Sequence, residues 1–134
     1  MGAGCGKREI QLSLRGTDTL NLDENGAALP VVLRIYQLKG RDRIENADFT
    51  PLWKNDTEVL EGDIVERQEL TLLPDSKVIV KVEPRKESGF LAVMALFRKR
   101  RGNDWRQVIA LKGSKVHSVE IVLEEGAIMI QKVK

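Results

Sequence analysis

The sequence predicts an all-β domain, a two-sheet β-sandwich of about eight strands with one short helical insertion between strands 2 and 3. Three observations support this fold class. Apolar and polar residues alternate over most of the chain, with the period of half-buried strands. Turn-forming residues separate these segments at short intervals. Only residues 40–63 have no strand period, and they contain helix-capping residues instead.

The predicted strands differ in how deeply they should be buried. The first, residues 9–15 (EIQLSLR), alternates strictly and therefore has one buried face. The second, residues 31–38, is more continuously apolar and is expected deeper in a sheet. Residues 90–98 are apolar on both faces, which is typical of a central strand. The remaining predicted strands are residues 66–73, 77–83, 105–111, 116–123 and 127–133.

Three short turns are predicted to close hairpins between neighbouring strands. They are the Leu-Pro-Asp-Ser sequence at residues 73–76, Gly-Asn-Asp at residues 102–104 and Glu-Glu-Gly at residues 124–126. Each contains residues that favour tight turns and lies between two segments with an apolar strand pattern. The sequence therefore favours strands that pair with their neighbours along the chain.

The insertion at residues 40–63 is predicted to contain two short helices. Asp48 can cap the first, with a proline in its first turn, where a missing N–H costs little. Asp56 or Thr57 can cap the second, which Gly62 would end. Three apolar side chains of the first helix share a face that is expected to point to the core, with a second interface as the alternative: Phe49, Leu52 and Trp53.

Length and composition are those of one globular domain. A chain of 134 residues buries roughly two thirds of its unfolded surface, so it needs no disulfide or metal to be stable. The net charge of +2 and pI near 8.8 do not require a nucleic-acid or anionic-membrane partner. The single cysteine, Cys5, excludes an intrachain disulfide and a cysteine-based zinc site. No apolar run approaches the ~20 residues that span a bilayer, and no complete signal peptide is expected.

No pattern of reactive residues indicates an enzyme. His117, the only histidine, is expected to be a partly buried strand residue beside Val119 and Ile121, rather than a base or metal ligand. The N-terminal GAGCGK lacks the spacing of a phosphate-binding loop, and there is no nucleophile elbow. We therefore predict no catalytic residue, no metal and no cofactor.

Two further segments have alternative interpretations. The basic run Arg98, Lys99, Arg100 and Arg101 is expected to be a solvated hairpin tip, because few aromatic residues could stack on bases. Binding to nucleic acid or to anionic lipid head groups are the alternatives. Residues 20–30 join two strands with about eleven residues, whereas tight hairpin loops use roughly 2–5. This loop contains apolar residues, so it either folds back on its own domain or is presented to a partner.

Several short segments, taken in order, resemble a known family. They are LN at residues 20–21 before a loop with a glycine, PVVLRIYQL at 30–38, ADF at 47–49, LW at 52–53, VLEGD at 59–63, LP at 73–74 and WR at 105–106. In this order and spacing, residues 10–133 resemble the TssJ (SciN) family, the outer-membrane lipoprotein of the type VI secretion system. The resemblance implies a transthyretin-like β-sandwich with a small helical insertion.

The resemblance also implies a location and a partner. Members of the family are lipid-anchored at the periplasmic face of the outer membrane and bind the periplasmic C-terminal region of TssM, an inner-membrane protein. The implied function is a scaffold that ties the secretion membrane complex to the outer membrane, with no nucleic-acid or small-molecule partner. The family's contact loop lies between the first two strands, which here corresponds to Leu20, Asn21, Leu22, Asp23, Glu24, Asn25, Gly26, Ala27, Ala28, Leu29 and Pro30.

The resemblance also implies that Cys5 is the lipid anchor. Ala3-Gly4-Cys5 resembles the end of a lipobox, so residues 1–8 are expected to be a tether and residues 9–134 the sandwich. Gly6 in place of aspartate after the cysteine favours the outer membrane. Gly2 stands where a lipobox carries a large apolar residue, so we expect the first residues to derive from expression and this polypeptide itself to stay soluble and unlipidated.

Two other functional classes are compatible with the sequence. A soluble periplasmic transthyretin-like carrier or chaperone predicts a bound small molecule or a defined homodimer. A nucleic-acid binder predicts salt-sensitive affinity through the basic run at residues 98–101. For the scaffold, the expected contact residues are apolar anchors flanked by polar groups, namely Leu22, Asp23, Glu24, Asn25 and Leu29.

Overall fold

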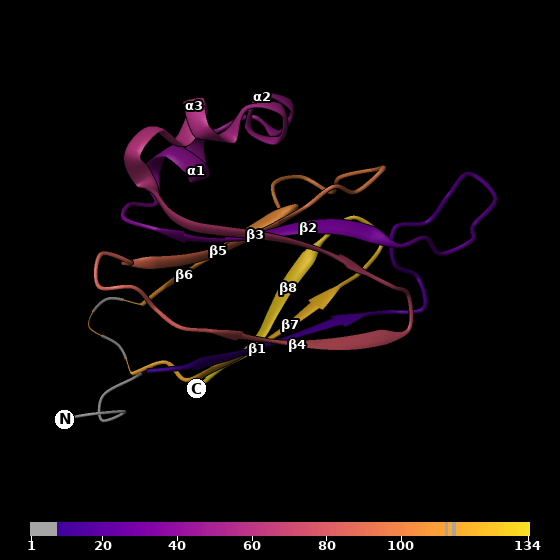
Figure 1. Cartoon of the computed structure of the whole chain (residues 1–134). Coiled ribbons are helices and arrows are strands. Elements are labelled where there is room, and N and C mark those ends of the chain that lie inside the picture. Colours follow the sequence, from indigo (N-terminus) through magenta and orange to yellow (C-terminus); the bar gives the residue numbers. More distant parts are fainter. Residues whose placement is uncertain (1–7, 112, 114) are drawn as a thin grey trace.

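The computed structural model describes residues 8–111, 113 and 115–134. In this part of the chain, eight strands form two four-stranded sheets that lie face to face, so the predicted all-β sandwich is confirmed (Figure 1). One sheet has the order β4-β1-β7-β8 and the other β3-β2-β5-β6. The strands are β1 (Ile10–Gly16), β2 (Val31–Leu38), β3 (Ile64–Leu72), β4 (Ser76–Val82), β5 (Phe90–Ala95), β6 (Arg106–Ala110), β7 (Ser118–Leu123) and β8 (Ile128–Val133).

Strand β1 has one buried and one exposed face, as its alternating sequence predicts. This strand pairs antiparallel with β4 and parallel with β7, and its register places Leu12 opposite Val80 and Val119. Leu12 is fully buried, whereas the intervening Gln11 is exposed. The period of two therefore separates a core face from a solvent face, as expected for one sheet of a sandwich.

The two strands with the most continuous apolar sequence are central and buried on both sides. β2 lies between β3 and β5, with Leu33 on the inner face and Tyr36 on the outer face, both fully buried. β5 is buried from Leu91 to Ala95. The outer faces of these strands are covered because the helical insertion lies over them (Figure 1). This second layer explains why neither strand alternates.

The insertion between β2 and β3 contains three short helices and a turn of 3₁₀-helix. They are α1 (Asp42–Asn46), α2 (Phe49–Lys54), α3 (Asp56–Leu60) and the 3₁₀ turn Glu61–Asp63. Each α-helix buries one aliphatic side chain completely, namely Ile44, Leu52 and Leu60. Phe49 and Trp53 are only partly buried and stack with ring centroids 6.0 Å apart. The insertion is therefore attached along its length to the outer face of the sheet.

The predicted helix caps are correct for α2 and wrong for α3. Asp48 is the N-cap residue of α2, although its side chain makes no capping hydrogen bond. Asn55 rather than Asp56 or Thr57 is the N-cap residue of α3. Asp56 is the first residue of that helix, and its carboxylate points to the sheet because Tyr36 and Arg67 hydrogen-bond to it there. Helix α1 was not predicted.

One predicted hairpin is absent, because residues 73–76 cross from one sheet to the other. β3 and β4 are the edge strands of different sheets. The crossing is fixed at Asp75, which has a φ of 52° and donates its N–H to the Thr17 carbonyl at 3.1 Å. The other two predictions are confirmed, since β5 pairs antiparallel with β6 and β7 with β8.

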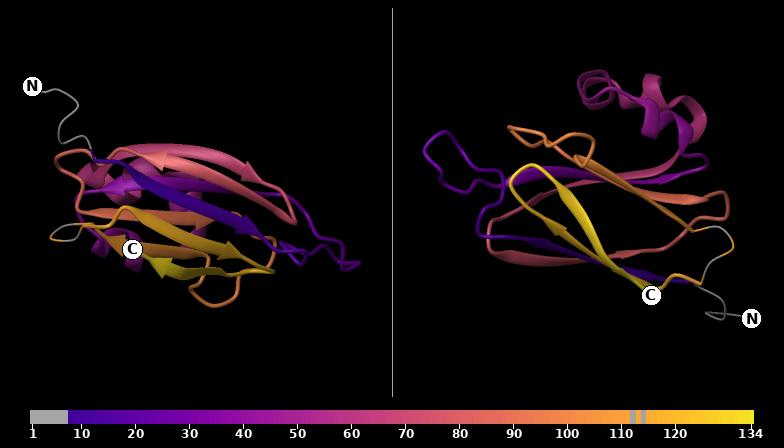
Figure 2. Two further views of the ribbon diagram at one scale, coloured as in Figure 1. Left: turned by 90° about the horizontal axis from the view of Figure 1, so that it is seen from below. Right: turned by 180° about the vertical axis from the view of Figure 1, so that it is seen from behind.

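The two ends of the sandwich differ (Figure 2). At one end lie the start of β1 and the C-terminus, and Arg8 donates a hydrogen bond to the Val116 carbonyl at 2.7 Å. At the other end lie the β1–β2 loop, the β3–β4 crossing, the β5–β6 connection and the β7–β8 turn. The long loop at residues 20–30 is therefore presented at the end opposite to the start of the domain.

Candidate functional site

The β1–β2 loop has a buried base and an exposed tip. Leu20 is fully buried and Asn21 is 5% exposed, whereas residues 24–27 are exposed. Leu22 and Leu29 are partly exposed. The sequence left open whether this loop folds back or is presented to a partner. The structure shows that the base folds back on the domain and that the tip is exposed.

Asn21 connects the loop to two neighbouring connections. Its Nδ2 donates to the Pro30 carbonyl at 3.0 Å, and its Oδ1 accepts the Arg98 N–H at 2.8 Å. Its own N–H donates to the Glu124 carbonyl at 3.2 Å. Asn21 has a φ of 47°, a left-handed conformation that asparagine tolerates better than most residues. A single buried side chain therefore fixes the start and end of the loop beside the β5–β6 connection.

Asp23 organises the exposed tip. Its carboxylate accepts the N–H groups of Asn25 and Ala27 at 2.8 and 2.9 Å, and its own N–H donates to the Ala27 carbonyl at 2.8 Å. The hydrogen bonds from Ala27 and then Asn25 lower the pKa of Asp23 below its ordinary value. Gly26, with a φ of 83°, supplies the left-handed turn. The loop tip is therefore a turn held by its own hydrogen bonds.

The β5–β6 connection, which carries the basic run, lies against this loop. Arg98 donates to the Leu22 carbonyl at 3.1 Å and lies 3.7 Å from the Glu24 carboxylate. Arg101 pairs with Glu125 of the β7–β8 turn at 3.2 Å. The four basic side chains are exposed, as expected for a hairpin tip, but two of them bind neighbouring connections. The contact between this basic run and residues 20–30 was not predicted from the sequence.

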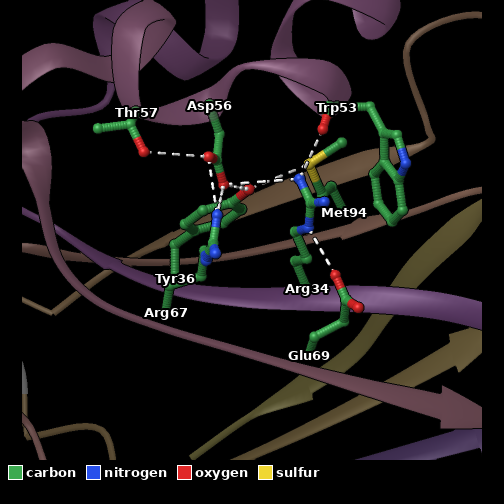
Figure 3. A network of polar contacts seen from close by, with 8 residues as sticks. All are labelled: Arg34, Tyr36, Trp53, Asp56, Thr57, Arg67, Glu69 and Met94. Atoms are coloured by element: carbon green, nitrogen blue, oxygen red, sulfur yellow. Dashed lines mark hydrogen bonds and ion pairs between the residues drawn. The ribbon is translucent and has the colours of Figure 1, made fainter.

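A second polar cluster, which the sequence did not reveal, joins the helical insertion to the sheet (Figure 3). The Tyr36 hydroxyl donates to Asp56 Oδ2 at 2.8 Å, and Arg67 Nη1 donates to the same oxygen at 2.6 Å. Arg34 lies 3.5 Å from that carboxylate, donates to the Trp53 carbonyl at 2.9 Å and stacks on the Trp53 ring at 3.9 Å. These contacts hold α2 and α3 on the outer face of the sheet.

The electrostatics of this cluster favour an ionised carboxylate. Burial acts to raise the pKa of Asp56, but hydrogen bonds from Arg67 and Tyr36 outweigh it, so the pKa lies below its ordinary value. Burial, and then the hydrogen bond to Asp56, raise the pKa of Tyr36. Both groups therefore keep one protonation state at neutral pH, which suits a structural cluster rather than proton transfer.

Acid is expected to remove the stability that Asp56 supplies. Because its pKa is lower in the folded state, the ionised carboxylate stabilises the fold above the unfolded pKa of about 3.9, and this stability is lost as the pH falls through the folded value. Urea denaturation of the wild type and Asp56→Asn should differ more at pH 7 than at pH 3. An equal difference at both pH values would contradict this assignment.

The predicted burial of His117 is wrong. The side chain is exposed, because His117 precedes the start of β7, where its N–H donates to the Lys134 carbonyl at 2.8 Å.

Within the described residues, no group of three or more histidine, cysteine, aspartate or glutamate side chains could hold a metal ion. No helix in this part of the chain is long and apolar enough to cross a membrane. Cys5, the predicted lipid anchor, lies outside the described residues.

The fold and the site together define a class of protein: a small β-sandwich that presents an ordered cluster of loops at one end. Residues 8–126 match the family model T6SS-SciN, described as "Type VI secretion lipoprotein, VasD, EvfM, TssJ, VC_A0113". The chain therefore belongs to the TssJ (SciN) family of type VI secretion lipoproteins, and the resemblance read from the sequence is confirmed.

Solved structures agree with this assignment. The T6SS lipoprotein TssJ1 from Pseudomonas aeruginosa is 27% identical, with a TM-score of 0.86 over 96% of this chain and 97% of that one. A chain of a structure described as "Type VI membrane complex" is 27% identical, with a TM-score of 0.85 over 94% and 99% of the two chains. A chain of a structure described as the T6SS protein TssM C-terminal domain from EAEC is 25% identical, with a TM-score of 0.81 over 94% and 99%. No curated protein sequence matches significantly.

Proposed function

We propose that this protein is a periplasmic scaffold, anchored in the outer membrane through an acylated Cys5, that binds the periplasmic C-terminal region of TssM. Residues 1–8 serve as the tether and residues 9–134 as the binding domain. Membership of a secretion-lipoprotein family supports the anchor. The similarity to chains of structures described as a type VI membrane complex and as the TssM C-terminal domain supports the partner. The scaffold performs no chemistry of its own.

One observation carries the proposal: the start of the domain and the β1–β2 loop lie at opposite ends of the sandwich (Figure 2). Arg8 is held at the first end by its hydrogen bond to Val116, and the loop extends from the second end. An anchor preceding Arg8 holds the first end near the membrane and leaves the second end facing the periplasm. The geometry suits a connection between the outer membrane and a partner that comes from the inner membrane.

Within the loop, the residues have two different roles in this proposal. Leu20 and Asn21 are buried and support the loop from below. The expected contact residues are exposed or partly exposed and combine apolar anchors with polar neighbours, as protein interfaces do: Leu22, Asp23, Glu24, Asn25 and Leu29. The turn organised by Asp23 holds this tip in one conformation, which reduces the entropy lost on binding.

Membrane fractionation tests the tether. The protein is produced behind a lipoprotein signal sequence, either as wild type or as Cys5→Ser, together with the periplasmic domain of TssM. The wild type should sediment with the outer membrane and retain the TssM domain there, whereas Cys5→Ser should leave both in the soluble periplasmic fraction, because stable anchoring needs acyl chains. Retention of Cys5→Ser in the outer membrane, or failure of the wild type to retain the TssM domain, would contradict the proposal.

A further inference from the structure

We propose that Lys99 and Arg100 are a specificity-determining pair that binds an acidic segment of the protein partner, in a cavity beside the β1–β2 loop. This inference rests on the proposed function, because it names the chemistry of the partner surface that the loop would contact. It gives a role to the basic run, which the scaffold function leaves unexplained.

Three connections line the cavity, which is open to solvent on one side and has a volume of about 330 Å³. Leu22 and Asp23 line it from the β1–β2 loop, residues 99–101 from the β5–β6 connection, and Glu125 with Gly126 from the β7–β8 turn. Its size suits one or two side chains of a partner rather than a whole domain. The cavity adjoins the exposed loop tip, so a protein bound to the tip would also cover it.

The positive charge in the cavity is not fully neutralised. The Glu125 carboxylate pairs with Arg101 at 3.2 Å, and the Asp23 carboxylate is engaged by the N–H groups of Asn25 and Ala27. The Lys99 side chain forms neither an ion pair nor a hydrogen bond with any described residue. Arg100 likewise has no carboxylate partner among the described residues, and its guanidinium lies 3.8 Å from the centroid of the Phe49 ring.

The backbone that carries these two cations is held at both ends. The Arg98 N–H donates to Asn21 Oδ1 at 2.8 Å, and the Arg101 N–H donates to the Gly126 carbonyl at 2.9 Å. Gly126 lies so close to the Lys99 carbonyl that there is no room for a Cβ atom. A solvated tip needs no such fixation, whereas a binding site benefits because the backbone that carries its charges need not be ordered on binding.

The surroundings favour an acidic protein segment over a polyanion. Asp23 and Glu125 on the cavity wall limit the negative charge that the cavity can accept, so one or two carboxylates fit it better than a continuous phosphate backbone. Phe49, the ring next to Arg100, is already covered by that guanidinium and also packs edge-on against Trp105 at 5.0 Å, so it offers no free face to a base. The three connections that line the cavity also lie at the end of the sandwich opposite to the start of β1 (Figure 2), away from the proposed membrane anchor.

Calorimetric titration with the periplasmic domain of TssM tests the inference. Lys99→Ala/Arg100→Ala should weaken binding about tenfold or more and reduce its dependence on salt, because charge pairs at an interface strengthen binding at low ionic strength. Lys99→Arg/Arg100→Lys keeps both charges and should restore most of the affinity. The matched control is Lys81→Ala/Lys132→Ala, which removes two exposed lysines at the other end of the sandwich and should bind as the wild type does.

The outcomes separate this inference from the proposed function. If the wild type binds and Lys99→Ala/Arg100→Ala binds equally well, the inference is wrong and the scaffold function stands. If the wild type does not bind, the scaffold function is wrong, and backbone NMR titration with a hexaglutamate peptide, a dT oligonucleotide and phosphatidylglycerol vesicles decides the inference alone. Shifts at Lys99, Arg100 and Gly126 caused mainly by the peptide would support it. Stronger effects of the oligonucleotide or the vesicles, or no shift with the peptide, would overturn it.

Discussion

Replacing Asp56 with alanine is expected to lower the free energy of unfolding by about 3 kcal/mol. Among the described residues, the Tyr36 hydroxyl donates to the Asp56 carboxylate at 2.8 Å, and its other acceptor is the Met94 sulfur, which lies 3.6 Å away. Without the carboxylate, a fully buried hydroxyl loses its main acceptor and Arg34 loses one of its two carboxylates. Most of the cost is the desolvation of groups left without a partner.

Urea denaturation of two variants measures this effect. Asp56→Asn keeps an acceptor for Tyr36 and should cost less than Asp56→Ala. Glu45→Ala is the control, because Glu45 also lies in the insertion and pairs with an arginine, Arg41, but both side chains are 40% exposed. Exposed pairs contribute about 0.5 kcal/mol or less. A cost for Asp56→Ala as small as that for Glu45→Ala would show that the cluster does not hold the insertion.

Replacing Asn21 with alanine is expected to weaken binding to the periplasmic domain of TssM about tenfold while the sandwich stays folded. The substitution removes the hydrogen bonds to Pro30 and Arg98 that hold the loop base and the basic connection together. It also places alanine at a φ of 47°, which costs roughly 1 kcal/mol. Both effects release the loop, so the partner must order it again on binding.

A glycine variant separates these two causes. Asn21→Gly tolerates the positive φ but lacks the side chain, so it should bind as weakly as Asn21→Ala if the hydrogen bonds are what matters. The control is Asn46→Ala, which removes an exposed asparagine that donates to the Asp42 carbonyl in α1. Calorimetry should find the affinity of this control unchanged. Wild-type affinity in both Asn21 variants would show that the loop base does not support the binding surface.

The sequence predicted the elements whose signal is local. The bounds of β2 are as predicted, because its apolar run is continuous and ends at turn-forming residues. The insertion was recognisable from Asp48 and the loss of strand period. Helix α1 was missed because residues 42–46 (DRIEN) contain a single apolar residue, Ile44, and its cap residue Arg41 makes no side-chain capping bond.

Contacts between distant segments could not be read from the sequence. The turn at residues 73–76 has the composition of a hairpin, and only the packing of two sheets makes it a crossing. Asp56 was interpreted as a cap, a local role, although its partners Tyr36 and Arg67 lie on the sheet. Asn21 and Arg98 are 77 positions apart, and their hydrogen bond places the basic run beside the loop. The composition of either segment alone gives no sign of this contact.

The most direct test of the scaffold proposal is calorimetric binding of residues 6–134 to the periplasmic C-terminal domain of TssM, with the loop tip present or removed. Residues 22–28 are replaced by a short Gly-Ser turn, which keeps the buried Leu20 and Asn21 and the Leu29 N–H that donates to the Leu20 carbonyl at 3.0 Å. We predict saturable binding by the wild type and none by the variant, with thermal unfolding showing that both are folded. Unchanged affinity in the folded variant would contradict the assignment of this loop as the contact with TssM.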